Sequence, residues 1–488
     1  MPIPVQSQSL PPRWRGAGLA VAAALLVAGC ADIPITRQVA LPDVPKQAEA
    51  SPSQREHQRI LASYGGSYDE PRLEAMLNRV IERLVAASER PDLHYKVVIL
   101  NSPAVNAFAL PNGQLYVSRG LLALANDNAE LASVLAHEMA HVVARHAAIR
   151  EDQARQAALI SRVATDVFND PEMSALTVAK SKIALAGFSR AQEFEADGIG
   201  VGTSSRAGFD PYGAVRFLTA MGRNASLRVA GNQNSDPRFL EFLSSHPATP
   251  DRVRNAQANA RQYAAPGAGD RERAGYLAAL ENLPYGEDPS EGYVRGRRFL
   301  HPKLGFTFMA PVGFALDNTA QAVLGVKDGG AQALRLDVVR VPAEQSLADY
   351  LQSGWIENVD PRSIENLNVN GFASVTALAT GDQWVFRLYA VRFGTEVYRF
   401  IFAAKSQTEE GDRSFRAAME SFRRMTVAEI DAAKPLRLKI LTVAPGDTAE
   451  RLAGRMATDR PLERFLVLNG LEHGHALRPG DRMKIVVE

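Results

Sequence analysis

In the first third of the chain, apolar side chains recur at the spacing of an α-helix. Residues 54–63 predict a first helix, and Gly65 and Gly66 follow it. Residues 71–87 predict a second helix, whose apolar positions are Leu73, Met76, Leu77, Val80, Ile81 and Leu84. Residues 130–146, ELASVLAHEMAHVVARH, are rich in Ala, Leu and Val and contain no Gly or Pro, and Asn128 precedes them as a candidate N-cap. This stretch predicts a helix of about five turns.

Strand signals precede this helix. Residues 95–100 predict one strand, and residues 106–110 and 115–118 flank Pro111-Asn112-Gly113, where Asn followed by Gly is a strong hairpin signal. Two interpretations of the hairpin stay open. It is a purely structural element, or one of its strands is an edge on which an extended substrate pairs its backbone. The positions concerned are Asn106, Ala107, Phe108, Gln114, Leu115 and Tyr116.

The second half of the chain predicts two further units. Strands are predicted at residues 305–310, 332–341, 384–393 and 397–404, with a two-residue turn at Gly394-Thr395 and helices near residues 346–353 and 412–425. These elements indicate a smaller α+β domain with an antiparallel sheet, which begins after a Gly-rich, charged boundary at residues 288–298. Residues 438–487 then predict the order strand, helix, helix, strand.

A chain of 488 residues is too long for one hydrophobic core, so a multidomain α+β protein is expected. We predict a mainly helical domain with a small edge sheet at residues 53–287, the α+β domain at residues 296–430, and the βααβ module at residues 436–488. An apolar content of 46% and a charged content of 22% are typical of globular proteins. Lys and Arg number 55 against 54 for Asp and Glu, which indicates no nucleic-acid partner.

The N-terminus has the pattern of a secretory signal. Arg13 and Arg15 precede an apolar run at residues 17–28, which is too short to span a bilayer as a mature helix. Residues 31–52 contain four prolines together with Ala, Gln and Ser, the composition of an extended tether. An Ala-rich stretch at residues 151–187 is interrupted by charges and does not predict a membrane span either.

Cys30 is the only cysteine, which excludes an intramolecular disulfide and a cysteine-based zinc site. The sequence Leu-Val-Ala-Gly-Cys at residues 26–30 resembles the bacterial lipobox, and this implies that residues 1–30 are a lipoprotein signal with Cys30 as the lipidated residue. Since Ala31 follows the cysteine, the same resemblance favours the outer membrane. The alternative is an ordinary signal peptide followed by an idle cysteine.

Three residues of the central helix have the pattern of a metal site. At roughly 100° per residue, His137 and His141 lie about 40° apart on one face, close enough to hold one Zn²⁺ together. Glu138 flanks them, placed to reach a water molecule on the metal rather than the metal itself. His146 lies roughly 180° round the same helix, so we exclude it as a ligand. The alternative is a chance pentapeptide on a buried helix.

Residues 188–200 supply a third ligand, which a catalytic zinc site requires. Glu193 and Asp197 lie one turn apart on one helical face, while Glu195 points about 160° away. We assign Glu193 as the ligand and Asp197 as the acceptor of the other ring N–H of a zinc histidine. The alternative is a solvated acidic face.

These segments together resemble a known family. The runs NAFALPNGQLYVSRGLL, ELASVLAHEMAHVVARH and FSRAQEFEAD are similar to the zinc metallopeptidases of the CAAX prenyl protease and HtpX type, and more closely to the periplasmic branch of BepA-type lipoprotein relatives. The resemblance covers roughly residues 53–264. It implies a gluzincin with one Zn²⁺ per chain, held by His137, His141 and Glu193, with Glu138 as the catalytic base. The turn Pro-Asn-Gly departs mildly from the usual Pro-Gly-Gly.

His246, in SSHPATPDRV, resembles a family position where a histidine lies near the metal. It is either a fourth ligand that silences the enzyme or a group that stabilises the oxyanion, a role also open to Arg190. The alternative is a histidine at a helix entry before Pro247.

The C-terminal module resembles a lysin motif (LysM), a small peptidoglycan-binding fold. The matching residues are Val443, Pro445-Gly446-Asp447-Thr448, Leu452-Ala453, Leu468-Asn469, Leu477 and Pro479-Gly480-Asp481, whereas Ala449 stands where Leu is usual. The segment GFTFMAPVGFALDN faintly resembles PsbP-like modules. Neither resemblance establishes a ligand.

The sequence therefore predicts a lipid-anchored periplasmic zinc endopeptidase that cleaves polypeptides, including misfolded or misassembled envelope proteins. Its expected partners are the membrane and either peptidoglycan or the machinery of outer-membrane protein assembly. Two alternatives stay open. One is a gated or inactive chaperone or cell-wall-binding scaffold that acts through its C-terminal domains. The other is a peptidoglycan amidase, which the HExxH geometry does not support.

Overall fold

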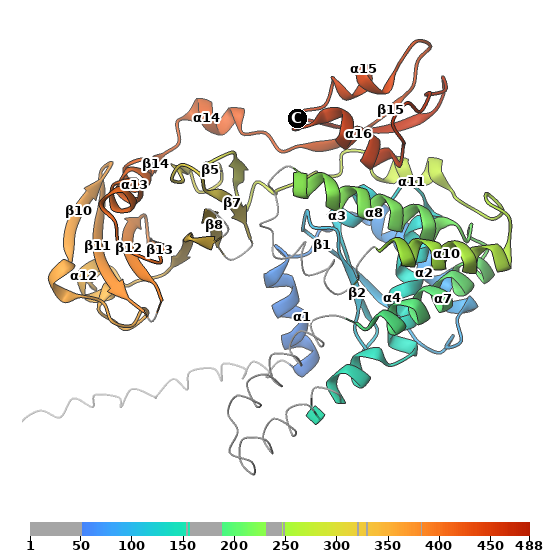
Figure 1. The fold of residues 1–488 in the computed structure, drawn as a ribbon, viewed down its shortest axis with the longest axis horizontal. Helices are drawn as coiled ribbons and strands as arrows, with labels where there is room; N and C mark the ends of the chain where they lie inside the picture. Colours follow the sequence, from blue (N-terminus) through green and yellow to red (C-terminus); the bar gives the residue numbers. More distant parts are fainter. Residues whose placement is uncertain are drawn as a thin grey trace, which may run out of the picture. The chain divides into compact units, whose positions relative to one another are not determined.

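The computed structural model describes residues 51–152, 155–156, 188–230, 246, 249–319, 322–327, 330–381 and 383–488 (Figure 1). The chain divides into two units, residues 1–50 and residues 51–488. The predicted signal peptide, Cys30 and nearly all of the tether lie outside the described residues, as does most of the Ala-rich stretch at 151–187. None of the described helices is long and apolar enough to cross a membrane.

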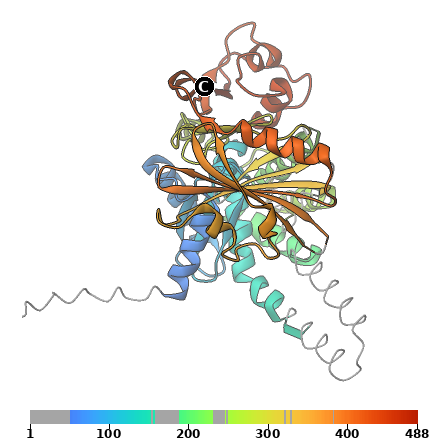
Figure 2. The ribbon, with the colours of Figure 1, turned by 90° about the vertical axis from the view of Figure 1, so that its left-hand side faces the viewer.

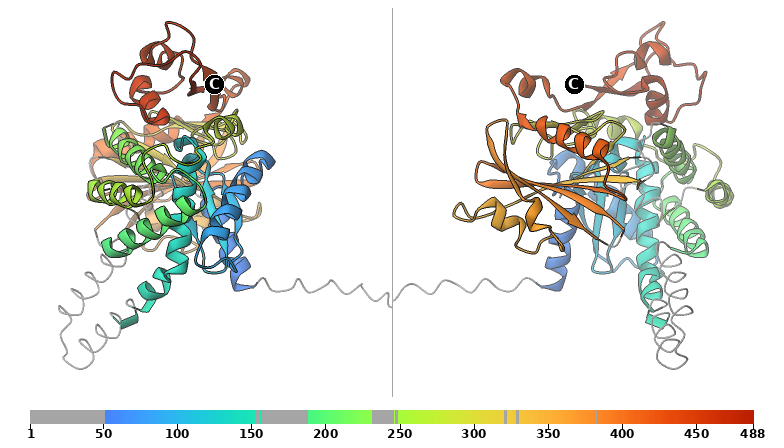
Figure 3. Two further views of the ribbon diagram at one scale, coloured as in Figure 1. Left: turned by 90° about the vertical axis from the view of Figure 1, so that its right-hand side faces the viewer. Right: turned by 60° about the vertical axis from the view of Figure 1, so that its left-hand side comes forward.

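The first part of the described chain is mainly helical, as predicted. Its helices are α1 (Pro52–Ser63), α2 (Pro71–Ala87), α3 (Arg119–Leu124), α4 (Asn128–Val143), α7 (Arg190–Arg206), α8 (Gly213–Ala230), α10 (Pro250–Tyr263) and α11 (Arg273–Ala279). The six apolar positions predicted for α2 are all buried. Helix α4 packs against α7 and α8. Helix α10 also packs against α7 and α8 (Figure 3).

The boundaries of α4 differ from the prediction. Its N-cap is Asp127 rather than Asn128, because Asp127 has an extended backbone and its carboxylate accepts a hydrogen bond from the Glu130 N–H at 2.9 Å. The helix ends at Val143, and Arg145 adopts a left-handed φ of 58°. His146 therefore lies beyond the end of the helix rather than on its far side.

A small sheet precedes α3 and has the order β1-β3-β2. Strands β2 (Ala107–Ala109) and β3 (Gln114–Ser118) form the predicted hairpin, and β1 (Lys96–Leu100) pairs with β3 in parallel. Because β3 lies between two partners, the prediction of an edge strand at Gln114, Leu115 and Tyr116 is wrong. Strand β2, which carries Ala107 and Phe108, is an edge of this sheet and lies against α4.

The middle domain contains an antiparallel sheet of seven strands, in the order β10-β11-β12-β13-β9-β8-β7. The strands are β7 (Ala315–Asn318), β8 (Val323–Lys327), β9 (Gln332–Val339), β10 (Glu365–Val369), β11 (Phe372–Thr380), β12 (Val385–Phe393) and β13 (Glu396–Ala404). The predicted hairpin at Gly394 joins β12 to β13. Helix α13 (Glu409–Glu420) covers one face of this sheet (Figure 2), where Phe415 stacks on Phe402.

A second sheet of the middle domain has the order β14-β6-β5-β4. Its strands are β4 (Tyr293–Arg295), β5 (Arg298–His301), β6 (Phe306–Met309) and β14 (Arg423–Arg424). The domain also contains the helix α12 (Leu347–Leu351) and the 3-10 turn Pro361–Ser363, and α14 (Val427–Ala432) follows it. Sequence patterns predicted β6, β9, β12, β13, α12 and α13 but missed the other strands, including the nine-residue, mostly buried β11.

The C-terminal module has the predicted order of elements, β15 (Arg437–Thr442), α15 (Ala449–Ala453), α16 (Pro461–Asn469) and β16 (Arg482–Val487). Strands β15 and β16 pair antiparallel. Its apolar residues belong to the same hydrophobic cluster as those of α2, α3 and α4. The module and the helical region therefore share one core.

Candidate metal centre

The site forms where α4 and α7 approach each other closely. A Cβ at Gly200 of α7 would lie 3.0 Å from the backbone nitrogen of His137, so the absence of a side chain there permits the close approach. This contact places His137, Glu138 and His141 of α4 opposite Glu193 and Asp197 of α7. All five side chains are buried, whereas Glu195 of α7 is 58% exposed, as the helical spacing predicts.

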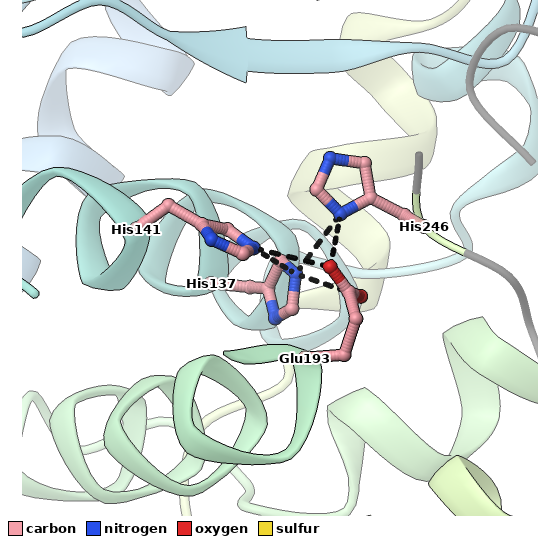
Figure 4. A group of neighbouring side chains, drawn as sticks. All are labelled: His137, His141, Glu193 and His246. Atoms are coloured by element: carbon pink, nitrogen blue, oxygen red, sulfur yellow. Dashed lines mark hydrogen bonds and ion pairs between the residues drawn. The ribbon is translucent and has the colours of Figure 1, made fainter. Parts of the chain in front are cut away.

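Four potential metal ligands converge in this space: His137, His141, Glu193 and His246 (Figure 4). The Nε2 atoms of His137 and His141 are 3.0 Å apart, and His141 Nε2 lies 3.4 Å from Glu193 Oε1. His246 Nδ1 lies 2.9 Å from Glu193 Oε1 and 3.4 Å from His137 Nε2. The four ligand atoms all lie within 4.8 Å of one another.

These distances fit a tetrahedral zinc ion. Bonds of about 2.0–2.1 Å at the tetrahedral angle put neighbouring ligand atoms about 3.3–3.4 Å apart. The measured separations scatter around this value. Two imidazole Nε2 atoms that face each other at 3.0 Å can share at most one proton, so a cation between them suits the geometry better than a hydrogen bond alone. The set of nitrogen and carboxylate ligands is also one that zinc prefers.

A buried network orients the ligands. Asp197 Oδ1 lies 3.0 Å from His137 Nδ1, which directs Nε2 of that ring toward the cluster. The Arg252 guanidinium lies 2.6 Å from Glu193 Oε2 and also contacts both carboxylate oxygens of Asp197, at 2.8 and 2.7 Å. A single arginine therefore holds the two buried acidic residues of α7, Glu193 and Asp197.

Arg252 was not found from the sequence. It lies in the first turn of α10, six residues after His246 in SSHPATPDRV. Only the fold, in which α10 packs against α7, brings its guanidinium to Glu193. The sequence feature that could have pointed to Arg252 is its position in the same short segment as His246.

The pKa values of these groups reflect burial and pairing. Burial opposes ionisation of Glu193, but hydrogen bonds to His141 and His246 outweigh it and hold the pKa of Glu193 far below its usual range. Burial opposes protonation of His137, and the hydrogen bond to Asp197 outweighs it and raises the pKa of His137. Burial lowers the pKa of His141 to about 3, so this ring is a neutral ligand at ordinary pH.

Glu138 differs from the other acidic residues. It is buried, and its Oε1 has no hydrogen-bond partner among the described residues. Burial raises the pKa of its carboxyl group. A buried carboxylate with an unused oxygen, next to a group of potential metal ligands, is suited to accept a proton from a bound water molecule.

Two other sequence predictions change. Arg190 is not in the site, because its side chain is 76% exposed and, among the described residues, it pairs with Asp251 at 3.9 Å. His146 is not among the four converging ligands, as predicted, but the reason is different. The chain turns back after α4, so His146 is buried with its Nδ1 atom 2.8 Å from His141 Nδ1.

Comparisons with known proteins agree with this geometry. Residues 71–260 match the model of Peptidase family M48. The chain is 30% identical over 229 residues to the mitochondrial metalloendopeptidase OMA1 of Schizosaccharomyces pombe, which covers 46% of this chain and 65% of that protein. It is 31% identical over 203 residues to the beta-barrel assembly-enhancing protease of Escherichia coli (strain K12), which covers 40% of each. These alignments span less than two thirds of either relative.

The search of solved structures also gave a match. The solution structure of cyanobacterial PsbP from Synechocystis covers 28% of this chain and 98% of that one, with 14% identity and a TM-score of 0.21, which is too low to carry an argument. The match to the model of Peptidase family M48, at residues 71–260, includes the four converging side chains His137, His141, Glu193 and His246 together with Glu138.

Proposed function

We propose that this protein is a zinc-dependent endopeptidase of the bacterial cell envelope. The observation that carries the proposal is the convergence of two histidines of α4 and Glu193 of α7 at zinc-ligand distances, beside a buried Glu138 with an unused oxygen. The named relatives, a metalloendopeptidase and a protease, support the same class of reaction.

Glu138, Asp197 and Arg252 have different roles in this reaction. A bound zinc ion would polarise the scissile carbonyl and activate a water molecule. Glu138 accepts the proton of that water and returns it to the leaving amine. The pKa of Glu138, which burial raises, suits a group that carries a proton between these two steps. Asp197 and Arg252 keep His137 and Glu193 in position.

We propose that His246 controls access to the metal. A catalytic zinc site has three protein ligands and one open position, whereas four ligands close it. With Nδ1 of His246 at 2.9 Å from Glu193 Oε1, the arrangement corresponds to the closed form. His246→Ala is expected to raise basal cleavage. An unchanged rate together with an unchanged zinc affinity would remove His246 from the site.

Strand β2 is the proposed docking edge for an extended substrate. It is an outer strand of its sheet and lies against the metal helix α4. A peptide in β-conformation would gain backbone hydrogen bonds there without regard to its sequence, which suits an enzyme that accepts unfolded segments. Asn106 has a structural role instead, because its side chain is buried and donates a hydrogen bond to the Tyr64 hydroxyl at 2.8 Å.

The N-terminal pattern and the relatives support a proposal for the location and the partners. We propose export, lipidation at Cys30 and attachment to the outer membrane on its periplasmic side. The beta-barrel assembly-enhancing proteases among the relatives favour misassembled envelope proteins as substrates. Glycan binding by the LysM-like module is a separate possibility that the βααβ order alone supports.

The second candidate function is a gated or inactive scaffold that acts through its C-terminal domains. The closed four-ligand cluster is the observation that favours it. Glu138 favours the enzyme, because a scaffold does not require a buried carboxyl group with an unused oxygen beside the cluster.

The test is zinc analysis and casein cleavage by the wild type and by Glu138→Gln. The proposal predicts zinc in both proteins and cleavage only by the wild type. Equal cleavage by both would point to a contaminating protease, and zinc in both without any cleavage by the wild type or by His246→Ala would favour the scaffold.

A further inference from the structure

A small cavity opens beside Glu138. Its volume is about 40 Å³. Its apolar wall is a stripe at helical spacing on α8, formed by Ala214, Phe217, Leu218 and Met221, and all four side chains are buried. Ser133 and Val134 of α4 continue this wall.

The rest of the cavity wall belongs to the metal centre. His137, Glu138, Asp197, His246 and Arg252 line it. Arg252 and Asp197 are paired with each other through two hydrogen bonds. The Glu138 carboxyl group, whose Oε1 has no hydrogen-bond partner among the described residues, also lines the cavity, so the apolar stripe is the part of the wall that an aliphatic side chain would contact.

The position of Glu138 relates the cavity to a bound peptide. A base that returns the proton to the leaving amine must lie within about 2.6–3.2 Å of that nitrogen. The nitrogen belongs to the residue that follows the scissile bond, the P1′ residue. The P1′ side chain starts one bond further on, at the adjacent Cα. It therefore leaves the backbone next to the cavity that Glu138 lines.

The volume limits what can enter. A cavity needs about 10–15 Å³ to hold one water molecule, so about 40 Å³ fits a small or medium aliphatic side chain but no aromatic ring. The buried rings and methylenes of Phe217 and Met221 form the stripe and cannot move aside without disturbing the packing of α8 on α4.

We propose that this cavity is the S1′ subsite of the enzyme and that α8 selects Ala, Val or Leu immediately after the scissile bond. The proposal rests on the endopeptidase function proposed above. It assigns a specificity role to Ala214, Phe217 and Met221, which hold neither the metal nor the water.

The test uses the full zinc-loaded chain and fluorogenic peptides that share one sequence, taken from a casein cleavage site, and differ only at P1′. The peptides carry Ala, Leu or Phe, and kcat/KM is measured for each. Wild type is expected to cleave the Leu peptide about 10-fold or more faster than the Phe peptide. Phe217→Ala is expected to raise the ratio of Phe to Leu cleavage by about 10-fold.

A second variant fills the cavity instead of enlarging it. Ala214→Leu is expected to lower the ratio of Leu to Ala cleavage by about 10-fold, so the proposal stays testable if Phe217→Ala fails to fold. Leu227→Ala is the matched control, because Leu227 is a buried residue of the same helix that does not line this cavity. It should leave all the ratios unchanged.

The outcomes separate the two proposals. Cleavage by the wild type with ratios that neither Phe217→Ala nor Ala214→Leu alters would overturn the S1′ assignment alone. Absence of any cleavage above the level of Glu138→Gln would overturn the endopeptidase function and the subsite with it.

Discussion

The middle domain and the C-terminal module are joined to the peptidase region in different ways. The middle domain packs around its own aromatic core, which includes Phe306, Phe400 and Phe415. The C-terminal module has no separate core among the described residues, since Phe465 and Ile485 belong to the cluster that also contains the apolar residues of α2 and α4. The last segment of the chain is therefore part of the peptidase unit.

The route of the chain supports this distinction. The Tyr285 N–H donates to the Leu436 carbonyl at 2.8 Å, and the Leu438 N–H donates to the Leu283 carbonyl at 2.9 Å. The chain thus leaves the peptidase region and returns to it at adjacent points. The middle domain is therefore an insertion between two hydrogen-bonded segments. The C-terminal module packs on the peptidase region although the middle domain separates the two in the sequence.

A buried lysine fixes the module to the peptidase region. The ammonium group of Lys484 on β16 donates hydrogen bonds to the carbonyls of Ala123, Leu124 and Ala125, at 2.7, 3.2 and 2.8 Å. These carbonyls end helix α3 and have no partners within that helix. The connection α3–α4, which leads into the metal helix, is therefore held by a residue about 360 positions away.

The largest expected effect comes from removing either the C-terminal module or the middle domain. Truncation after residue 435 would expose the shared core, and we expect it to abolish the cooperative unfolding transition of the peptidase region, whose free energy of unfolding is expected to be only roughly 5–15 kcal/mol, and to leave that of the middle domain. Replacement of residues 288–434 by a short Gly-Ser linker should leave a folded, zinc-binding protein. Calorimetry and zinc analysis of the two shortened proteins test these expectations. A stable truncated peptidase would contradict the shared core.

Single core substitutions make the same comparison at smaller scale. Phe465 and Phe400 are both fully buried, and each change to Ala should cost about 3–5 kcal/mol. Phe465→Ala is expected to lower the transition of the peptidase region, whereas Phe400→Ala should lower only that of the middle domain. Calorimetry with casein cleavage as a second probe distinguishes them. Equal effects of both variants on cleavage would argue against an independent middle domain.

The smallest predicted effect concerns Lys484. Lys484→Met removes the Lys484 donor from three buried carbonyls, of which that of Leu124 still accepts from the Asn126 side-chain amide, and should lower the free energy of unfolding by about 1–3 kcal/mol. Lys439→Met on the neighbouring strand is the control, because Lys439 is exposed and its loss should change stability by less than about 0.5 kcal/mol. Denaturant titration gives both values. Equal midpoints would mean that Lys484 contributes nothing to the attachment.

Local patterns predicted much of this structure. The spacing of apolar residues in α2 identified its six buried positions, and helical spacing placed Glu193 inward and Glu195 outward. The HExxH sequence identified two of the four converging side chains, because their relative geometry is set within about one helical turn. These are properties of short segments, which the sequence displays directly.

Other features depend on contacts between distant segments and were not predictable. The parallel pairing of β1 with β3 places β3 in the centre of its sheet. The left-handed Arg145 ends α4 and brings His146 back onto His141. The position of Arg252 at Glu193 depends on how α10 packs, which no local pattern specifies.

The central claim is that Glu193 completes a zinc site with His137 and His141, and zinc affinity measures this most directly. The matched pair is Glu193→Ala and Glu195→Ala, two residues apart on α7, of which only the first reaches the cluster. We predict one zinc ion per chain in the wild type and in Glu195→Ala, and an affinity more than about 100-fold weaker in Glu193→Ala. Equal zinc affinity in both variants would contradict the claim.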